Sequence, residues 1–247
     1  MWDDILLYAV VGFTAQIVDG SIGMAYKIAA SSLLLTAGVS PATASACVHT
    51  AGTFTTAASG LAHWHLGNID PRLVWRLMMP GMIGGAIGVF VLANVPGEAI
   101  RPWVSVYLLL IGVFILWKAL KFGSRSREVS VRVAPVGFLG GLLDAIGGGG
   151  WGPIVTSALV GRGVAPRAAI GSVNAAEFFV TLVISSTFLA TVGISLWPII
   201  AGLVAGGIVA APLAALVVRH LPERVLIIAV GSVVLVLSCL GLLKVLI

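Results

Sequence analysis

The chain has 247 residues, of which 59% are hydrophobic and only 9% are charged, and its mean hydropathy is +1.12. A soluble domain carries about 25% charged residues, so this composition excludes a soluble protein and makes the lipid bilayer the solvent. The net charge of +5 does not indicate nucleic-acid binding, because the cations are scattered at the ends of apolar segments, where membrane topology signals are found.

Apolar segments follow one another along the chain, and each is predicted to be a membrane-inserted helix. They cover residues 5–18, 22–37, 41–62, 77–95 and 100–120 in the first half, and 133–146, 151–162, 166–191, 196–218 and 222–246 in the second. A polar linker at 121–132, expected to be cytoplasmic, separates a first membrane repeat at 1–120 from a second at 133–247. We therefore predict an all-α, polytopic integral membrane protein with about five inserted segments in each repeat.

The two halves are copies of one unit. With a shift of 125 residues, positions 11–56 align with 136–181 without gaps, and 15 of the 46 aligned residues are identical. The identical pairs include Asp19 with Asp144 and Gly23 with Gly148. The first two segments of each half are short and broken by glycine, so they either cross the membrane twice or form a re-entrant hairpin.

The distribution of positive charge favours an inverted orientation of the two repeats. With an odd number of crossings per half and the N-terminus outside, eleven Lys and Arg residues are cytoplasmic and two are outside. An even number gives eight against five. Because cytoplasmic loops carry an excess of Lys and Arg, we predict inverted repeats in the cytoplasmic membrane, with both termini outside.

The second half contains four consecutive glycines, Gly147, Gly148, Gly149 and Gly150, followed by Trp151. Such a run is a poor helix, so one helix is predicted to end there and another to start near Trp151. Backbone without helical partners is tolerated at membrane depth only where it is buried in protein or lines a cavity. The free N–H groups at a helix start attract anions, which makes this break a candidate anion site.

The equivalent stretch of the first half contains Ser21, Gly23, Tyr26 and Lys27. Lys27 lies in an apolar segment, where it would attract an anion, pair with Asp19 or Asp144, or snorkel to the cytoplasmic face.

Acidic and polar side chains add to both halves of this candidate site. Asp19 and Asp144 either titrate during transport or cap the helix starts that follow them. The third segments contribute His49 and Thr53 in one half, and Asn174 and Glu177 in the other. Glu177 has Gly52 as its repeat partner, so it breaks the symmetry, and it is either a proton carrier or a hydrogen-bonded structural acid. His49 either packs in the core or lines the site.

No metal site or cofactor is predicted. The two histidines of the run 63–65 (His-Trp-His) alternate on opposite sides of a helix, without a carboxylate or thiol at ligand spacing. This run is better explained as an interfacial segment with an aromatic anchor. The glycine pairs at 84–85 and 206–207 are predicted to allow close packing of helices.

The pattern Gly-Phe-x5-Asp-x3-Gly, followed by more glycine, an aromatic residue and proline, occurs in two copies and resembles the sulfite exporter TauE/SafE family of membrane permeases. Residues 63–70 (HWHLGNID) and 171–179 (GSVNAAEFF) are also similar to that family. The resemblance implies transport of sulfite, sulfonates or related organosulfur or organic anions. Its motif positions are Asp19, Gly23, Asp144, Gly147, Gly148, Gly149 and Gly150. The first copy departs from the glycine-rich form at Met24, Ala25 and Lys27.

We therefore expect a secondary transporter, not an enzyme, that moves a small anion by alternating access with proton or ion coupling. A small-anion channel is the alternative, and a membrane enzyme or assembly factor is a third possibility. The expected substrate-binding residues are Ser21, Gly23, Tyr26, Lys27, His49, Thr53, Gly147, Gly148, Gly149, Gly150, Trp151 and Asn174. The expected coupling or capping residues are Asp19, Asp144 and Glu177. The expected partners are the anion and lipid, and the sequence leaves a homodimer open.

Overall fold

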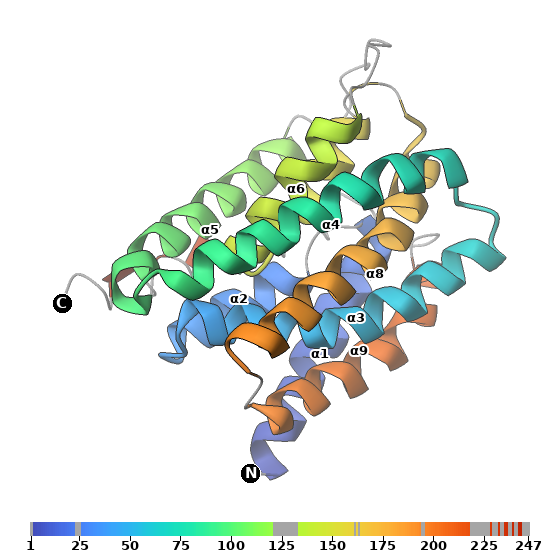
Figure 1. Cartoon of the computed structure of the whole chain (residues 1–247). Helices are drawn as coiled ribbons and strands as arrows, with labels where there is room; N and C mark the ends of the chain where they lie inside the picture. Colours follow the sequence, from blue (N-terminus) through green and yellow to red (C-terminus); the bar gives the residue numbers. More distant parts are fainter. Residues whose placement is uncertain are drawn as a thin grey trace.

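The computed structural model describes residues 2–22, 26–120, 133–160, 162, 164–193 and 196–217, together with a few positions between 228 and 243. These residues form helices and no strand, which confirms the all-α fold (Figure 1). The first half contains α1 (Trp2–Ile22), α2 (Tyr26–Thr36), α3 (Pro41–His65), α4 (Pro71–Asn94) and α5 (Gly97–Leu120). The second contains α6 (Val133–Gly147), the π-helical turn η1 (Gly152–Thr156), α7 (Ser157–Val160), α8 (Pro166–Thr191) and α9 (Trp197–Val217). The predicted linker at 121–132 and most of the predicted segment 222–246 lie outside the described residues.

The start of α4 differs from its prediction, because the helix begins at Pro71 instead of at residue 77. The Asp70 carboxylate accepts hydrogen bonds from the backbone N–H groups of Arg72 and Leu73, at 2.9 and 3.4 Å. Proline suits the first turn of a helix because its missing N–H has no partner there. This cap therefore starts the helix six residues before the apolar segment that hydropathy indicates, at 77–95.

Four helices among the described residues are long and apolar enough to cross a membrane: Pro71–Asn94, Gly97–Trp117, Arg167–Thr191 and Trp197–Ala214. The shorter helix α2 has 11 residues, and at 1.5 Å per residue it spans about 16 Å. The hydrocarbon core is about 30 Å thick, so α2 alone covers only about half of that depth.

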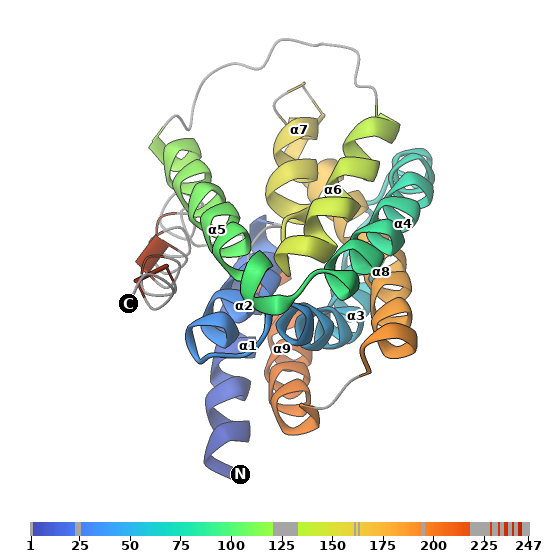
Figure 2. The same cartoon turned by 60° about the vertical axis from the view of Figure 1, so that its left-hand side comes forward.

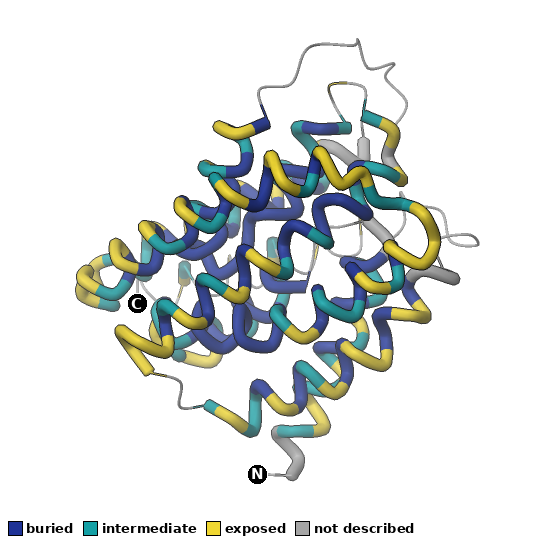
Figure 3. The backbone as a smooth tube through the Cα atoms, turned by 45° about the vertical axis from the view of Figure 1, so that its right-hand side comes forward, coloured by how far each residue is buried: buried dark blue, intermediate teal, exposed yellow. Residues whose placement is uncertain are grey.

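Large apolar residues are exposed along the helices, where a soluble protein would present charge. Figure 3 marks the exposed positions along the helices in yellow. On α4 and α5 they include Trp75, Ile83, Phe90, Trp103 and Leu110, each at least half exposed. Exposed apolar surface of this extent marks contact with an apolar environment, and here it fits the acyl chains of a bilayer.

The two halves interlock through their helices. The first helix of each half packs against the fourth helix of the other, giving the pairs α1 with α9 and α6 with α4 (Figure 2). The repeat-equivalent helices α3 and α8 pack against each other between these pairs. Their equivalent residues Thr56 and Thr181 meet, with hydroxyl oxygens 3.4 Å apart. A residue meets its own repeat partner only near an axis that relates the two copies.

Glycines let the paired helices touch through their backbones, as predicted for these runs. A Cβ atom on Gly141 of α6 would overlap the carbonyl of Gly81 of α4, and one on Gly84 would overlap the carbonyl of Phe138. In the other pair, a Cβ on Gly206 of α9 would overlap the Ala9 carbonyl of α1. These close approaches fix the spacing of the two helix pairs, α1 with α9 and α4 with α6.

Candidate functional site

The predicted break in the second half is present. Helix α6 ends at Gly147, and Gly148 and Gly149 have φ angles of +64° and +151°. These conformations favour glycine because a Cβ atom would be strained there. Helical structure resumes at Trp151, so the chain reverses its course inside the bundle within three residues.

One buried aspartate in each half accepts a hydrogen bond from the start of the next helix. The Asp144 Oδ1 atom accepts from the Trp151 backbone N–H at 2.9 Å, and the Asp19 Oδ1 atom accepts from the Tyr26 N–H at 3.2 Å. Both contacts span seven residues and are repeat-equivalent. Each carboxylate thus satisfies a free N–H group at a helix start, although from inside the preceding helix and not from the N-cap position.

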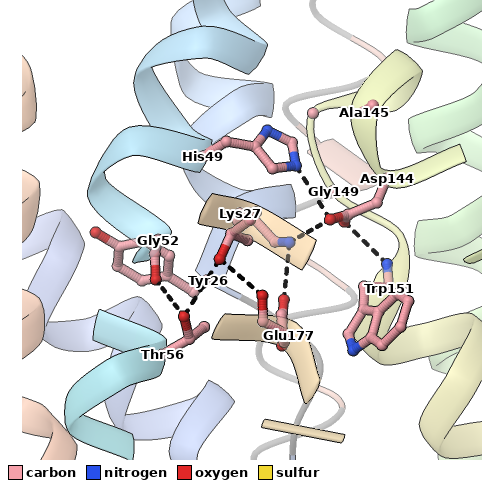
Figure 4. A network of polar contacts seen from close by, with 12 residues as sticks. Tyr26, Lys27, His49, Gly52, Thr56, Asp144, Ala145, Gly149, Trp151 and Glu177 are labelled. Atoms are coloured by element: carbon pink, nitrogen blue, oxygen red, sulfur yellow. Dashed lines mark hydrogen bonds and ion pairs between the residues drawn. The ribbon is translucent and has the colours of Figure 1, made fainter. Parts of the chain in front are cut away.

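Lys27 lies at the centre of a buried ionic cluster (Figure 4). Its side chain is 5% exposed, its ammonium contacts Asp144 Oδ2, and its Nζ atom lies 2.8 Å from Glu177 Oε1. Lys27 therefore does not snorkel to the membrane surface. It pairs with Asp144, one of the two expected partners, and with Glu177, whose contact the sequence did not indicate.

The cluster depends on two places where the repeat is not symmetric. The repeat partner of Lys27 is Gly152, and that of Glu177 is Gly52. A Cβ atom at Gly52 would lie 3.4 Å from Lys27 Cδ, so the glycine faces the stem of the lysine. Each half therefore supplies one charged residue and one glycine, and the ion pair joins α2 of the first half to α8 of the second.

His49 ties α3 to the same carboxylate. Its Nε2 atom lies 3.0 Å from Asp144 Oδ2, and its Nδ1 atom lies 2.8 Å from the Ser45 carbonyl oxygen. The Ser45 hydroxyl donates to the Ala145 carbonyl at 2.6 Å. His49 is fully buried, so it is both a core residue and a neighbour of the ionic cluster.

Side chains of the first half cover the glycine run in this conformation. The Ser31 hydroxyl donates to the Gly148 carbonyl, and the Tyr107 hydroxyl donates to the Gly149 carbonyl at 3.0 Å. The Tyr107 ring occupies the space where a side chain at Gly147 would lie. An anion would reach this stretch only after these side chains move. Tyr107 was not predicted, although a hydroxyl-bearing aromatic residue in the apolar segment 100–120 was a signal for it.

Other expected site residues have polar contacts with groups outside the ionic cluster. Asn174 Oδ1 accepts from the Ser59 hydroxyl at 3.0 Å, and Thr53 Oγ1 lies 3.1 Å from Ser185 Oγ, both between α3 and α8. The Tyr26 hydroxyl donates to the Leu203 carbonyl at 3.0 Å, which joins α2 to α9. The side chain of Ser21 and all of Gly23 lie outside the described residues.

The histidine run at the end of α3 combines a buried histidine with an exposed tryptophan. His63 is 7% exposed, and its Nδ1 atom lies 3.3 Å from Asn68 Nδ2. The neighbouring Trp64 is 63% exposed, as an interfacial anchor would be. Within the part of the chain that the structure describes, no three His, Cys, Asp or Glu side chains are grouped so that they could hold a metal ion.

Comparison with known proteins assigns the chain to a family. The family model of the sulfite exporter TauE/SafE matches residues 8–240, a span that contains the glycine run and every residue of the ionic cluster. The chain belongs to the TauE/SafE sulfite exporter family. The resemblance drawn from the paired Gly-Phe…Asp…Gly motifs is therefore confirmed.

A curated relative supports the same assignment. This TauE/SafE chain is 38% identical, over 246 aligned residues, to the "Probable membrane transporter protein YtnM" of Bacillus subtilis (strain 168). The alignment covers 95% of this chain and 81% of the relative. No solved structure matches the chain. The TauE/SafE chain is thus a membrane protein from a family of permeases.

Proposed function

We propose that the protein is a secondary transporter of a small anion, of the sulfite, sulfonate or related organosulfur or organic class. The observation that carries this proposal is the buried Lys27 ammonium, which pairs with Asp144 and Glu177 close to the helix break at Gly148 and Gly149. A lysine inside a membrane segment costs about 2.5–3.5 kcal/mol on insertion scales, and such residues mark ion and substrate pathways. The family and its curated relative support the transport role.

Lys27 is proposed to bind the anion in exchange for a carboxylate. Lys27 is paired with Asp144 and Glu177, so an anion must displace one of them. Asp144 is also held by the Trp151 N–H and by His49. Among the described residues, the Glu177 carboxylate has a polar contact only with Lys27. Glu177 is therefore the easier partner to displace.

Displacement of Glu177 supplies a route to proton coupling. A buried carboxylate without a partner is costly, so a displaced Glu177 would take up a proton. One proton would then accompany each anion, with Lys27 returning to Glu177 after both are released. In this proposal Asp19 and Asp144 keep their hydrogen bonds to the two helix starts.

The ion pair also suits an alternating-access mechanism. The cation belongs to the first half and both carboxylates belong to the second, so the pair bridges the two bodies that would rock against each other. Inverted repeats with broken helices at the bilayer midplane are a recurrent transporter plan. The packing of α1 with α9 and of α6 with α4 supports two copies related by an axis. We propose that they are inverted repeats in the cytoplasmic membrane.

Reconstitution into proteoliposomes tests the proposal. Sulfite, thiosulfate, sulfoacetate and simple carboxylates are first screened for a rise in melting temperature, because a ligand of the folded state stabilises it. For a ligand that binds, we expect uptake driven by an inward proton gradient. Glu177→Gln should abolish the effect of the gradient, Lys27→Met should abolish binding, and Glu98→Gln, at an exposed position in the first turn of α5, serves as the control.

Three results would contradict parts of this mechanism. Gradient-driven uptake by Glu177→Gln would remove that residue as the proton carrier. Anion binding by Lys27→Met would remove the lysine as the binding cation. Flux without counterflow exchange would replace the transporter by an anion channel.

A further inference from the structure

An apolar cavity of about 480 Å³ lies between α5 and α6. The turn between α4 and α5 and the first half of α5 form one wall, and Leu143, Ile146 and Gly147 of α6 form the other. Tyr107 lines the cavity together with Gly147, the residue at which α6 ends. The cavity therefore extends from one end of the bundle to the start of the glycine run.

Tyr107 separates this cavity from the central site. Its ring fills the space beside Gly147, its hydroxyl fills the space beside Gly150, and the same hydroxyl donates to the Gly149 carbonyl at 3.0 Å. Beyond the tyrosine, a Cβ atom on Gly149 would lie 2.7 Å from the backbone nitrogen of Ile28, the residue that follows Lys27. One side chain and one turn of glycine backbone thus stand between the cavity and the segment that carries the buried cation.

We propose that this cavity is the access route between the central site and the membrane face at the α4–α5 turn, and that Tyr107 is the side chain that closes it. The inference rests on the proposed function, because it assigns a path to the anion that Lys27 is proposed to bind. It adds a gate residue and a side of entry. On the predicted topology the α4–α5 turn is outside, so this is the outer route.

Two further features suit a route that opens and closes. Against the other described helices, α5 packs less closely than α4 does, and Trp103 and Leu110 on it are more than half exposed, so a shift of α5 breaks few of these contacts. Near its start, the Arg101 Nη2 atom donates to the Leu35 carbonyl at 2.7 Å. Arg101 directly follows the lining residue Ile100 in the chain, and a cation near an apolar passage concentrates anions there.

Cysteine accessibility tests the route without needing a substrate. In a protein with Cys47 and Cys239 replaced by Ser, Ser31→Cys places a thiol beside Gly148, on the far side of Tyr107 from the cavity. A membrane-impermeant methanethiosulfonate is added to the α4–α5 side of oriented vesicles. Adding Tyr107→Ala should raise the labelling rate by about tenfold or more, because labelling of a buried thiol follows the population of open states. Tyr107→Phe keeps the ring and should raise it much less.

Two control cysteines show whether Tyr107→Ala opens only the path past Tyr107 or loosens the whole bundle. Ile146→Cys lines the cavity and should react readily while Tyr107 is present. A protein that retains only the native Cys47, fully buried in α3, should react slowly with or without Tyr107→Ala. If Tyr107→Ala does not yield a monodisperse protein, Tyr107→Leu provides the same comparison.

The proposal is overturned if shortening Tyr107 leaves the Ser31→Cys rate unchanged. It is also overturned if labelling occurs only from the α3–α4 side. These outcomes are independent of transport: a route that opens as expected in a protein that moves no anion would refute the proposed function alone.

Discussion

At the scale of single residues, the charged cluster arises from two substitutions that break the repeat. A symmetric duplication would place the same residue types at positions 27 and 152, and at 52 and 177. The chain instead has Lys27 and Glu177 in contact across the two halves, with Gly52 facing the lysine stem. The two similar halves therefore provide the paired helices, while the residues that differ between the halves provide the buried ion pair.

Removing the lysine should destabilise the protein, because it leaves two buried carboxylates facing each other. Breaking one partner out of a buried ion pair costs about 3–5 kcal/mol. Lys27→Met should therefore lower the midpoint of thermal unfolding in detergent, and adding Glu177→Gln should restore part of the loss. If the double variant melts no higher than the single one, the two side chains do not share an ion pair.

Part of this cluster could be predicted from the sequence, and part could not. An intramembrane lysine needs a partner, and the paired motif pointed to Asp144. The contact with Glu177 joins α2 to a helix 150 positions later, so only the folded arrangement of the helices reveals it. Asn174 was expected at the site because His49 is its repeat partner. Its amide oxygen accepts from Ser59 at the α3–α8 interface, and its part in anion binding stays a prediction.

At the scale of elements, composition predicted which segments are helical, and proline in the first turn marks where α3, α4 and α8 begin. The predicted segments 41–62 and 166–191 start where α3 and α8 do, at prolines that open each helix. The glycine run predicted the end of α6 and a new start near Trp151. The π-helical turn at Gly152–Thr156 was not predicted, because hydropathy carries no information on the hydrogen-bond spacing of a helix.

The effect of replacing a glycine in the helix contacts should depend on the atoms that the new side chain would contact. Gly141→Ala places a methyl group against the backbone of Gly81, so it should force α4 and α6 apart at a cost of about 1–3 kcal/mol. The matched change Gly97→Ala, where the nearest atom lies 3.8 Å away, should alter stability by no more than about 0.5 kcal/mol. Equal melting temperatures of the two variants would show that the α4–α6 contact is not tight.

At the scale of the whole molecule, the sequence predicted two copies of one unit but not their exchange of partners. The helix order alone would equally allow two separate bundles side by side. The structure pairs the first helix of each half with the fourth of the other. This arrangement is set by contacts between glycine backbones from distant parts of the chain, which no local pattern encodes.

The orientation of the repeats can be tested by labelling single cysteines in intact cells. With both native cysteines replaced by Ser, Glu98→Cys and Gly193→Cys should react with an impermeant maleimide from outside. Gly67→Cys and Arg162→Cys should react only after permeabilisation, because the positive-inside rule places their loops in the cytoplasm. The same sidedness for Gly67→Cys and Gly193→Cys, which follow the equivalent helices α3 and α8, would mean parallel repeats.

The exchange of helices between the halves has a consequence for the biogenesis of the protein. Helix α1 is made before its main partner α9, which follows nearly 200 residues later, so the first half cannot complete its packing during its own synthesis. The faces of α1 and α4 that later meet α9 and α6 stay uncovered until the second half has been inserted. Insertion of the first helices and completion of the bundle are therefore separate events in the assembly of this chain.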